Sequence, residues 1–216
     1  METTEDFEKL LKVLSEGNRA LERLDLIRVG GLTVEHLKKL TLCTSGLKDL
    51  SFPFGEKNSQ LSDEAIRDLL RANKDTLKRV QISFNQRVTE TTLLLLAECP
   101  HLQVVILRDC GGRTDKVVQE LLRNCPTTHL DVSDDYMSGS LGGREGPLTD
   151  AAFTYIPDSL ECLYFDYNQH LTEDMVKKLM ESKIRSMSWF GSKKKHDSSK
   201  RWSEFVVGHE KEWPTF

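Results

Sequence analysis

The feature that most constrains the fold is a short apolar pattern that recurs along the chain. In its clearest copy, residues 102–110, Leu102, Val105 and Leu107 hold positions one, four and six, and Cys110 holds position nine. Successive copies begin 24 to 33 residues apart. The copies start at Leu21, Leu47, Leu77, Leu102, Thr127, Leu160 and Ile184, of which the fifth and the last are the weakest matches.

Each copy predicts one strand followed by one helix. Alternating apolar residues indicate a strand with one buried face. A polar step follows, in which Thr or Ser precedes an acidic residue, as is typical of a helix N-cap and first turn. The helical stretches expected after these caps are 61–66, 93–97, 117–122, 151–156 and 175–180. One strand and one helix cannot bury their own apolar faces, so the copies must stack on one another.

This period and pattern are those of a leucine-rich repeat. We therefore predict an α/β fold, a leucine-rich-repeat solenoid shaped as a short horseshoe of about six or seven repeats. Parallel strands should form its concave face and helices its convex face. Two Cys-Pro pairs, Cys99-Pro100 and Cys125-Pro126, come just before strands, where proline cannot continue a helix.

The two ends of the chain differ from the repeats. Residues 1–20 predict an N-terminal capping helix, because four apolar residues share one helical face: Phe7, Leu10, Leu11 and Leu14. A docking helix for a partner is the alternative. The repeats should span residues 21–191. Residues 192–216 should form a basic linker and a C-terminal cap or tail, and the run 193–201 could instead serve as a nuclear-import or anion-binding patch.

One repeat carries a long insertion, residues 134–147, with four glycines. Such a segment predicts a surface loop that serves as a spacer or contacts a partner. Tyr136 and Met137 are the residues that favour partner contact. The glycines match no phosphate-binding loop.

Composition sets the broad class of the protein. The chain has 216 residues, a net charge of −4 and 30% charged residues, so we expect one extended domain, a monomer on its own, with no specific nucleic-acid binding. No apolar run is long enough to span a membrane, and the acidic N-terminus resembles no secretory or transit signal, so we expect a cytoplasmic or nuclear location. The five cysteines are an odd number, and three of them, Cys99, Cys110 and Cys125, occupy repeat slots, so we predict buried thiols rather than disulfides.

Motifs for chemistry are absent from the sequence. The six histidines lie in no metal-binding spacing, and no nucleophile elbow or dinucleotide fingerprint occurs. His129 and Asp131 should share a strand face, but no nucleophile stands nearby, so we interpret them as recognition surface. We expect no enzyme activity, no catalytic or metal-binding residue and no cofactor.

The concave face is the candidate binding surface. Positions three, five and seven of each repeat should point away from the core. Arg and Tyr at the centre of such a face are the residue types that anchor protein partners. Ile106 and Tyr164 are expected to be exposed there without a need in folding. The candidate partner-binding residues are Arg79, Gln81, Ile106, Arg108, Asp131, Tyr164 and Asp166.

A family resemblance rests on residues 99–110, where Cys-Pro is followed by L-x-x-L-x-L-x-x-C, and partly on residues 125–132. This combination resembles the cysteine-containing, ribonuclease-inhibitor-like repeats of F-box leucine-rich-repeat proteins, although residues 1–20 show no F-box. The resemblance implies a protein-protein interaction module that holds a protein partner on the concave face. The alternatives are a substrate-recognition component (adaptor) of a ubiquitin ligase and an assembly factor or structural subunit of a larger complex.

Overall fold

A computed structural model describes residues 4–16, 21–27, 29, 31–52, 61–134, 148–168, 170–189 and 205–207. Its strands form one sheet in which they follow one another in chain order. The first seven strands are parallel, and the eighth is antiparallel to the seventh. The strands are β1 (Arg23–Asp25), β2 (Asp49–Ser51), β3 (Arg79–Gln81), β4 (Val104–Ile106), β5 (His129–Asp131), β6 (Cys162–Tyr164), β7 (Ser186–Trp189) and β8 (Phe205–Val207).

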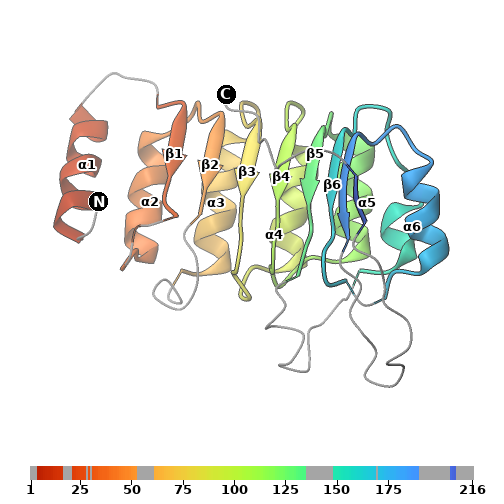
Figure 1. Cartoon of the computed structure of the whole chain (residues 1–216). Helices are drawn as coiled ribbons and strands as arrows, with labels where there is room; N and C mark the ends of the chain where they lie inside the picture. Colours follow the sequence, from red (N-terminus) through yellow and green to blue (C-terminus); the bar gives the residue numbers. More distant parts are fainter. Residues whose placement is uncertain are drawn as a thin grey trace.

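The helices cover one side of this sheet, and the strands form the other side (Figure 1). The 3-10 helices η2 and η4 join the α-helices in this layer. None of the helices that the structure describes is both long and apolar enough to cross a lipid bilayer. The elements are α1 (Thr4–Glu16), α2 (Val34–Cys43), α3 (Asp63–Asn73), α4 (Glu90–Leu94), η2 (Leu95–Glu98), α5 (Asp115–Asn124), η4 (Asp150–Phe153) and α6 (Glu173–Met180).

The strands pair in the register of the sequence repeat. Leu24 pairs with Leu50, and the same position four continues through every parallel strand to Met187. Positions four and six point into the layer between sheet and helices, and all of them belong to the buried core. The position-six residues are Leu26, Phe52, Ile82, Leu107, Val132, Phe165 and Trp189. The fold is a leucine-rich-repeat solenoid.

The predicted helix starts are confirmed. The side chains of Ser62, Thr89, Thr114, Thr149 and Thr172 each accept a hydrogen bond from a backbone N–H of the first turn that follows. The Cys-Pro pairs also end helices as expected. Cys99 follows η2 directly, and Cys125 follows α5 directly.

The structure differs from the prediction in three elements. The stretch 151–156 does not form an α-helix but only the short 3-10 helix η4, because Pro157 follows within one turn and disfavours helical backbone before it. Helix α2 was not expected, although Thr33 caps it and Leu37 and Leu40 share its buried face. Strand β8 falls where a cap or tail was expected, and only its pairing with β7 reveals it.

Helix α1 packs against α2 at the first end of the stack. The Phe7 side chain is fully buried, and its ring meets the His36 ring edge-on with centroids 5.2 Å apart. Leu11 is also buried in the common core. The helix thereby covers apolar side chains that the first repeat would otherwise expose.

Candidate protein-binding surface

The outer strand face carries two straight rows of side chains, one at position three and one at position five. The parallel register places each member beside its counterpart in the next strand. The row at position three is Arg23, Asp49, Arg79, Val104, His129, Cys162 and Ser186. The row at position five is Asp25, Ser51, Gln81, Ile106, Asp131, Tyr164 and Ser188. Arg108 and Asp166 lie two residues beyond position five in their repeats.

Arg79 is held within the face by three hydrogen bonds. Its Nη1 atom donates to Asp49 Oδ1 at 3.0 Å and to Ser51 Oγ at 3.1 Å. Its Nη2 atom donates to Gln81 Oε1 at 3.0 Å. The Arg79 side chain is only 12% exposed, and the Asp49 carboxylate is also approached by Arg23 Nη2 at 3.1 Å. This arginine therefore neutralises a buried carboxylate and is not a free cation for a partner.

The other charged candidates are also paired within the face. Arg108 Nη2 forms an ion pair with Asp131, whose side chain is fully buried. Asp131 Oδ1 also accepts a hydrogen bond from the Ser133 backbone N–H at 3.1 Å. Ser188 Oγ donates to Asp166 Oδ1 at 2.6 Å. Arg108 keeps a third of its side chain exposed, so it is the candidate charge that a partner can reach most directly.

The expectation that Ile106 and Tyr164 are exposed is wrong. Each keeps only 5% of its surface accessible, and Val104 in the same face keeps none. Tyr164 Oη lies 3.1 Å from Ser186 Oγ, within hydrogen-bond distance. Burial raises the pKa of the Tyr164 hydroxyl above its ordinary value. Strand alternation correctly predicts that these side chains point away from the core, but it cannot predict whether that face is covered.

His129 and Asp131 do share the strand face, but they form no catalytic pair. The Asp131 carboxylate is directed to Arg108 and to the Ser133 backbone. His129 Nδ1 lies 2.9 Å from Thr128 Oγ1. Burial lowers the pKa of His129 below its ordinary value, which favours the neutral ring. The remaining candidates, Tyr136 and Met137, lie outside the described residues.

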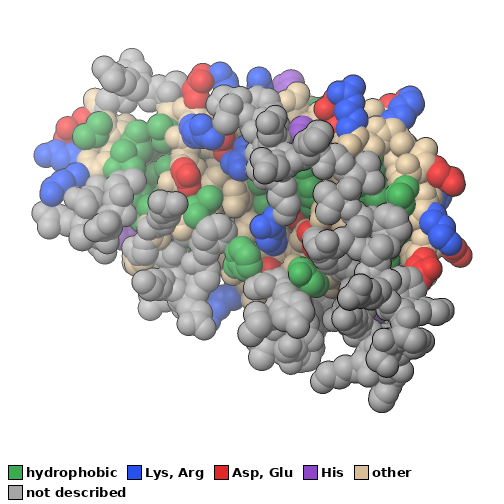
Figure 2. Space-filling model, viewed as in Figure 1, with side chains coloured by type: hydrophobic (Ala, Val, Ile, Leu, Met, Phe, Trp, Pro, Cys, Tyr) green, Lys and Arg blue, Asp and Glu red, His purple; other side chains and the backbone are tan. Residues whose placement is uncertain are grey.

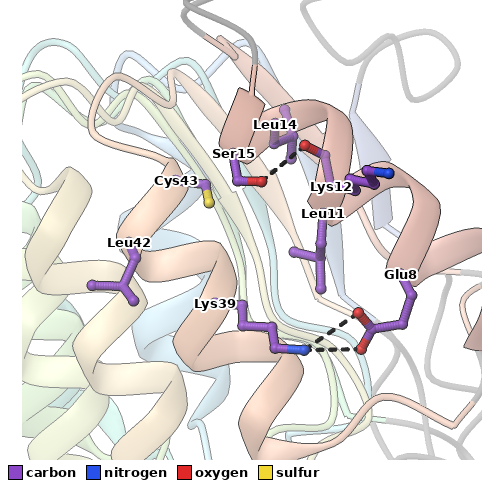
Figure 3. A pocket seen from close by; sticks show the side chains of 8 residues that line it. All are labelled: Glu8, Leu11, Lys12, Leu14, Ser15, Lys39, Leu42 and Cys43. Carbon is purple, nitrogen blue, oxygen red and sulfur yellow. Dashed lines mark hydrogen bonds and ion pairs between the residues drawn. The ribbon is translucent and has the colours of Figure 1, made fainter.

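A groove that was not predicted lies between α1 and α2 and has a volume of about 660 Å³ (Figure 3). Leu11 and Leu14 line it from α1, and Leu42 and Cys43 line it from α2. Leu42 is 87% exposed although it is apolar. The only signal in the sequence is that Leu42 lies off the helical face defined by the buried Leu37 and Leu40.

One end of the groove is closed by charged side chains. Lys39 Nζ contacts Glu8 Oε1 at 3.2 Å and Oε2 at 3.3 Å, and His36 Nε2 lies 3.1 Å from Glu8 Oε1. The hydrogen bond from Lys39 holds the pKa of the Glu8 carboxyl below its ordinary value. Seen from the strand side, hydrophobic side chains gather at the α1–α2 end of the molecule, with Lys and Arg beside them (Figure 2).

The cysteines in the repeat slots are buried thiols, as predicted. Burial raises the pKa of Cys99 and Cys110 to about 12 and that of Cys125 to about 11. Cys43 and Cys162 are half-buried, and all five thiols are free. Among the described residues, no group of His, Cys, Asp or Glu is placed to hold a metal ion.

Comparison with known proteins finds similar structures but no matching sequence family. No family model matches the sequence, and no curated protein matches it. One similar solved structure is the complex of Rad7 and Elc1 in yeast, with 24% identity over 60% of this chain and 29% of that one and a TM-score of 0.46. Another is the leucine-rich repeat-containing protein LegL7 from Legionella pneumophila, with 15% identity over 82% of this chain and 59% of that one and a TM-score of 0.49.

This chain therefore spans less than two thirds of either neighbour. At these scores neither neighbour supports an argument about function. The assignment of the solenoid rests on the strand order, the repeat register and the side-chain layers described above.

Proposed function

We propose that the chain is a non-enzymatic protein-interaction module that binds a protein partner on its concave strand face. The observation that carries the proposal is the unbroken register, which aligns side chains from seven strands into two rows on one rigid surface. Rigid surfaces bind with a small loss of conformational entropy. Arg23 and Asp25 are exposed in these rows, and Gln81, His129 and Cys162 are partly exposed.

The test is affinity capture from native lysate with three forms of the chain. Cys162→Arg places a bulky cation on strand β6 of the strand face, between His129 and Ser186. Thr91→Arg is the matched control, because Thr91 is exposed on α4 on the helix side. Circular dichroism and thermal melting check that both variants are folded.

The expected result is a protein that the wild type and Thr91→Arg retain and Cys162→Arg loses. Titration calorimetry with that protein after purification should then give a defined stoichiometry with the wild type and lost binding with Cys162→Arg. Equal binding by all three forms would exclude the strand face around β5 to β7 as the site.

A second candidate function is favoured by the groove between α1 and α2. An apolar side chain as exposed as Leu42 beside an apolar groove is typical of a docking surface. Here the chain would be an assembly factor or structural subunit. A partner that Cys162→Arg retains and Leu42→Glu loses would support this function over the first, and the change should not affect folding because Leu42 is 87% exposed.

The ubiquitin-ligase alternative, substrate recognition through another subunit, has only the sequence resemblance behind it. The yeast structure contains Rad7 with Elc1, but its TM-score of 0.46 supports no argument about this chain. Ligase subunits among the proteins captured by the wild type would favour this alternative.

A further inference from the structure

The contact between α1 and the start of α2 runs through a buried histidine. His36 is 5% exposed and is the third helical residue of α2. The side chain of Thr33, the N-cap of α2, accepts a hydrogen bond from the His36 backbone N–H at 3.3 Å. In return, the Thr33 backbone N–H donates to His36 Nδ1 at 3.2 Å. The two residues therefore form a capping box in which histidine takes the place of the usual Glu or Gln.

The contacts of the His36 ring fix the position of its proton. A backbone N–H can only donate, so Nδ1 must be unprotonated to accept from Thr33. The other ring nitrogen, Nε2, lies 3.1 Å from Glu8 Oε1 on α1. An ionised carboxylate can only accept, so Nε2 carries the proton. The ring is therefore neutral, and it is joined to the start of α2 by one nitrogen and to α1 by the other.

A second proton on this ring would have no acceptor. Protonation puts an N–H on Nδ1, where it would face the backbone N–H of Thr33. Buried donors without an acceptor are destabilising. The stronger attraction of a charged ring to Glu8 compensates only in part, because the Glu8 side chain is 47% exposed and already accepts two hydrogen bonds from Lys39 (Figure 3).

We propose that His36 is a pH-sensitive latch between α1 and α2. Protonation of Nδ1 ends the capping box at Thr33, and the ring leaves the position in which it contacts Phe7 and Glu8 of α1. Because the closed state cannot accommodate the second proton, proton uptake favours the open state. The latch is therefore closed at neutral pH and loosens as the pH falls. Histidine suits this role because its charge ordinarily changes between about pH 5 and 8.

The charged neighbours of the ring do not titrate in that range. Among the described residues, the charged side chains seen at the ring are Glu8 from α1 and Lys39 from α2. The hydrogen bond from Lys39 lowers the pKa of the Glu8 carboxyl, so Glu8 stays ionised. Lysine ordinarily titrates well above neutral pH. The event that changes this contact in mild acid is therefore the protonation of His36.

The caps of the later α-helices lack a group of this kind. Helices α3, α4, α5 and α6 also begin with a Ser or Thr N-cap. Their third helical residues have side chains that do not titrate, namely Ala65, Thr92, Val117 and Met175. Mild acid should therefore act on the α1–α2 end of the chain and leave the later helix starts intact.

The latch also bears on the groove between α1 and α2. Because these two helices form its walls, a looser contact between them changes its shape. A partner in the groove would then bind with different affinity at neutral pH and in mild acid. This consequence rests on the second candidate function, whereas the latch does not.

The first test locates the proton on the ring. The histidine ring nitrogens are isotope-labelled in the full chain, and NMR correlations between these nitrogens and the ring protons assign the tautomer. At about pH 7.5, His36 should be neutral with its proton on Nε2, and it should gain its second proton as the pH falls to about 5.5. A proton on Nδ1 at neutral pH would overturn the inference, and so would a ring that stays neutral at about pH 5.5.

The second test measures the loosening by hydrogen exchange of the full chain at the same two pH values. Protection factors are compared, because they remove the pH dependence of exchange itself. Those of α1 and of the first turn of α2 should fall about tenfold at the lower pH. This is the factor expected when an ordinary histidine takes up its proton in the open state alone. Those of α5 and β5 should not change.

His36→Gln is the variant that assigns the effect to this ring. A Gln side chain can accept from the Thr33 N–H and donate to Glu8, and it does not titrate. The pH dependence should therefore disappear. Only the ratio of protection factors at the two pH values is compared, so a change in overall stability does not matter. His101→Gln is the matched control, because His101 is an exposed histidine between η2 and β4, and it should keep the tenfold ratio.

Three outcomes of the exchange experiment would overturn the inference. One is a tenfold fall that persists in folded His36→Gln, because another group would then be the switch. Another is equal protection of α1 at both pH values in the wild type. The third is an equal fall in every helix, because acid would then weaken the whole chain. Neither test involves a partner, so the failure of the latch leaves the proposed function standing, and the reverse also holds.

Discussion

At the scale of single residues, three residues other than glycine adopt the left-handed backbone conformation, and all three hold the same repeat position. Phe84, Asp109 and Tyr167 have φ values of 56°, 53° and 61°, and each is the eighth residue of its repeat. At this point the chain leaves the strand and turns toward the helix. A left-handed residue other than glycine costs about 1–2 kcal/mol, and asparagine and aspartate tolerate it best. Phe84 and Tyr167 are not residue types that predict a left-handed turn, so these two turns could not be predicted from the sequence.

Gly112 shows how closely neighbouring repeats approach one another. A Cβ atom built there would lie 2.1 Å from the Thr89 carbonyl carbon and 2.2 Å from the Glu90 nitrogen. Because both are backbone atoms, Gly112→Ala should lower the free energy of unfolding by about 2 kcal/mol or more. Urea unfolding measures the change. Gly46→Ala is the control, since a Cβ there meets nothing within 4 Å, and equal losses in the two variants would contradict the explanation.

Thiol reactivity should divide the five cysteines into two classes. With pKa values raised to about 12, 12 and 11, Cys99, Cys110 and Cys125 stay neutral as well as buried at neutral pH. Because the thiolate is the reactive form, iodoacetamide at about pH 8 should alkylate the half-buried Cys43 and Cys162 first. Peptide mapping over time measures the order. Fast alkylation of Cys125 in the folded chain would show that its surroundings are more open than described.

At the scale of elements, the acidic residues at the helix starts link one repeat to the next. Asp115 Oδ1 accepts the Thr149 backbone N–H at 2.8 Å, and Oδ2 accepts the Thr149 hydroxyl at 2.6 Å. Asp63 holds Thr89 in the same way, and Asp150 holds Thr172. The N-cap Thr of one helix is thus held by the first-turn acid of the helix before it. The sequence predicts the caps, but only the stacking of repeats reveals the second role of the acids.

Asp115→Ala should therefore lower the free energy of unfolding by more than the removal of a favourable first-turn charge alone would. The variant loses both hydrogen bonds to Thr149. Because their acceptor is charged, we expect the free energy of unfolding to fall by about 1–3 kcal/mol. Asp174→Ala is the matched change, since Asp174 also lies in a first turn but is 95% exposed and only 3.6 Å from Lys177. That control should alter stability by less than about 0.5 kcal/mol. Thermal and urea unfolding of the two variants measure the difference. Similar losses of stability in both variants would refute the role of Asp115 in linking neighbouring repeats.

At the scale of the whole molecule, each repeat contacts mainly its neighbours, so the ends limit stability. Helix α1 covers the first end through Phe7 and Leu11, which belong to the common core. The face of α1 that carries Val13 is exposed to solvent and contributes little to the stability of this end.

Phe7→Ala should lower the free energy of unfolding by about 3 kcal/mol. The first repeats should lose more local stability than the later ones. Hydrogen exchange should accelerate in α2 and β2 and remain slow in α5 and β5. Val13→Ala on the same helix is the control, since Val13 is 66% exposed. Uniform acceleration along the chain would mean that the solenoid unfolds as one unit and that α1 has no local role.

The sequence determined the repeat, its register and the side of each strand that a residue occupies. Spacing of apolar residues is enough for this, because positions one, four and six can be buried only if the copies stack in register. The same spacing placed Arg79, Ile106 and Tyr164 on the strand face correctly.

Only the tertiary structure decided what happens on that face. Arg79 pairs with Asp49, which is 30 residues earlier in the chain, and Ile106 is closed to solvent. The groove around Leu42 and the strand β8 likewise arise from contacts between distant segments. Periodicity along one segment reports which side of a strand or helix faces the core. The exposure and charge of the outer side depend on segments far away in the sequence, and local patterns contain no record of them.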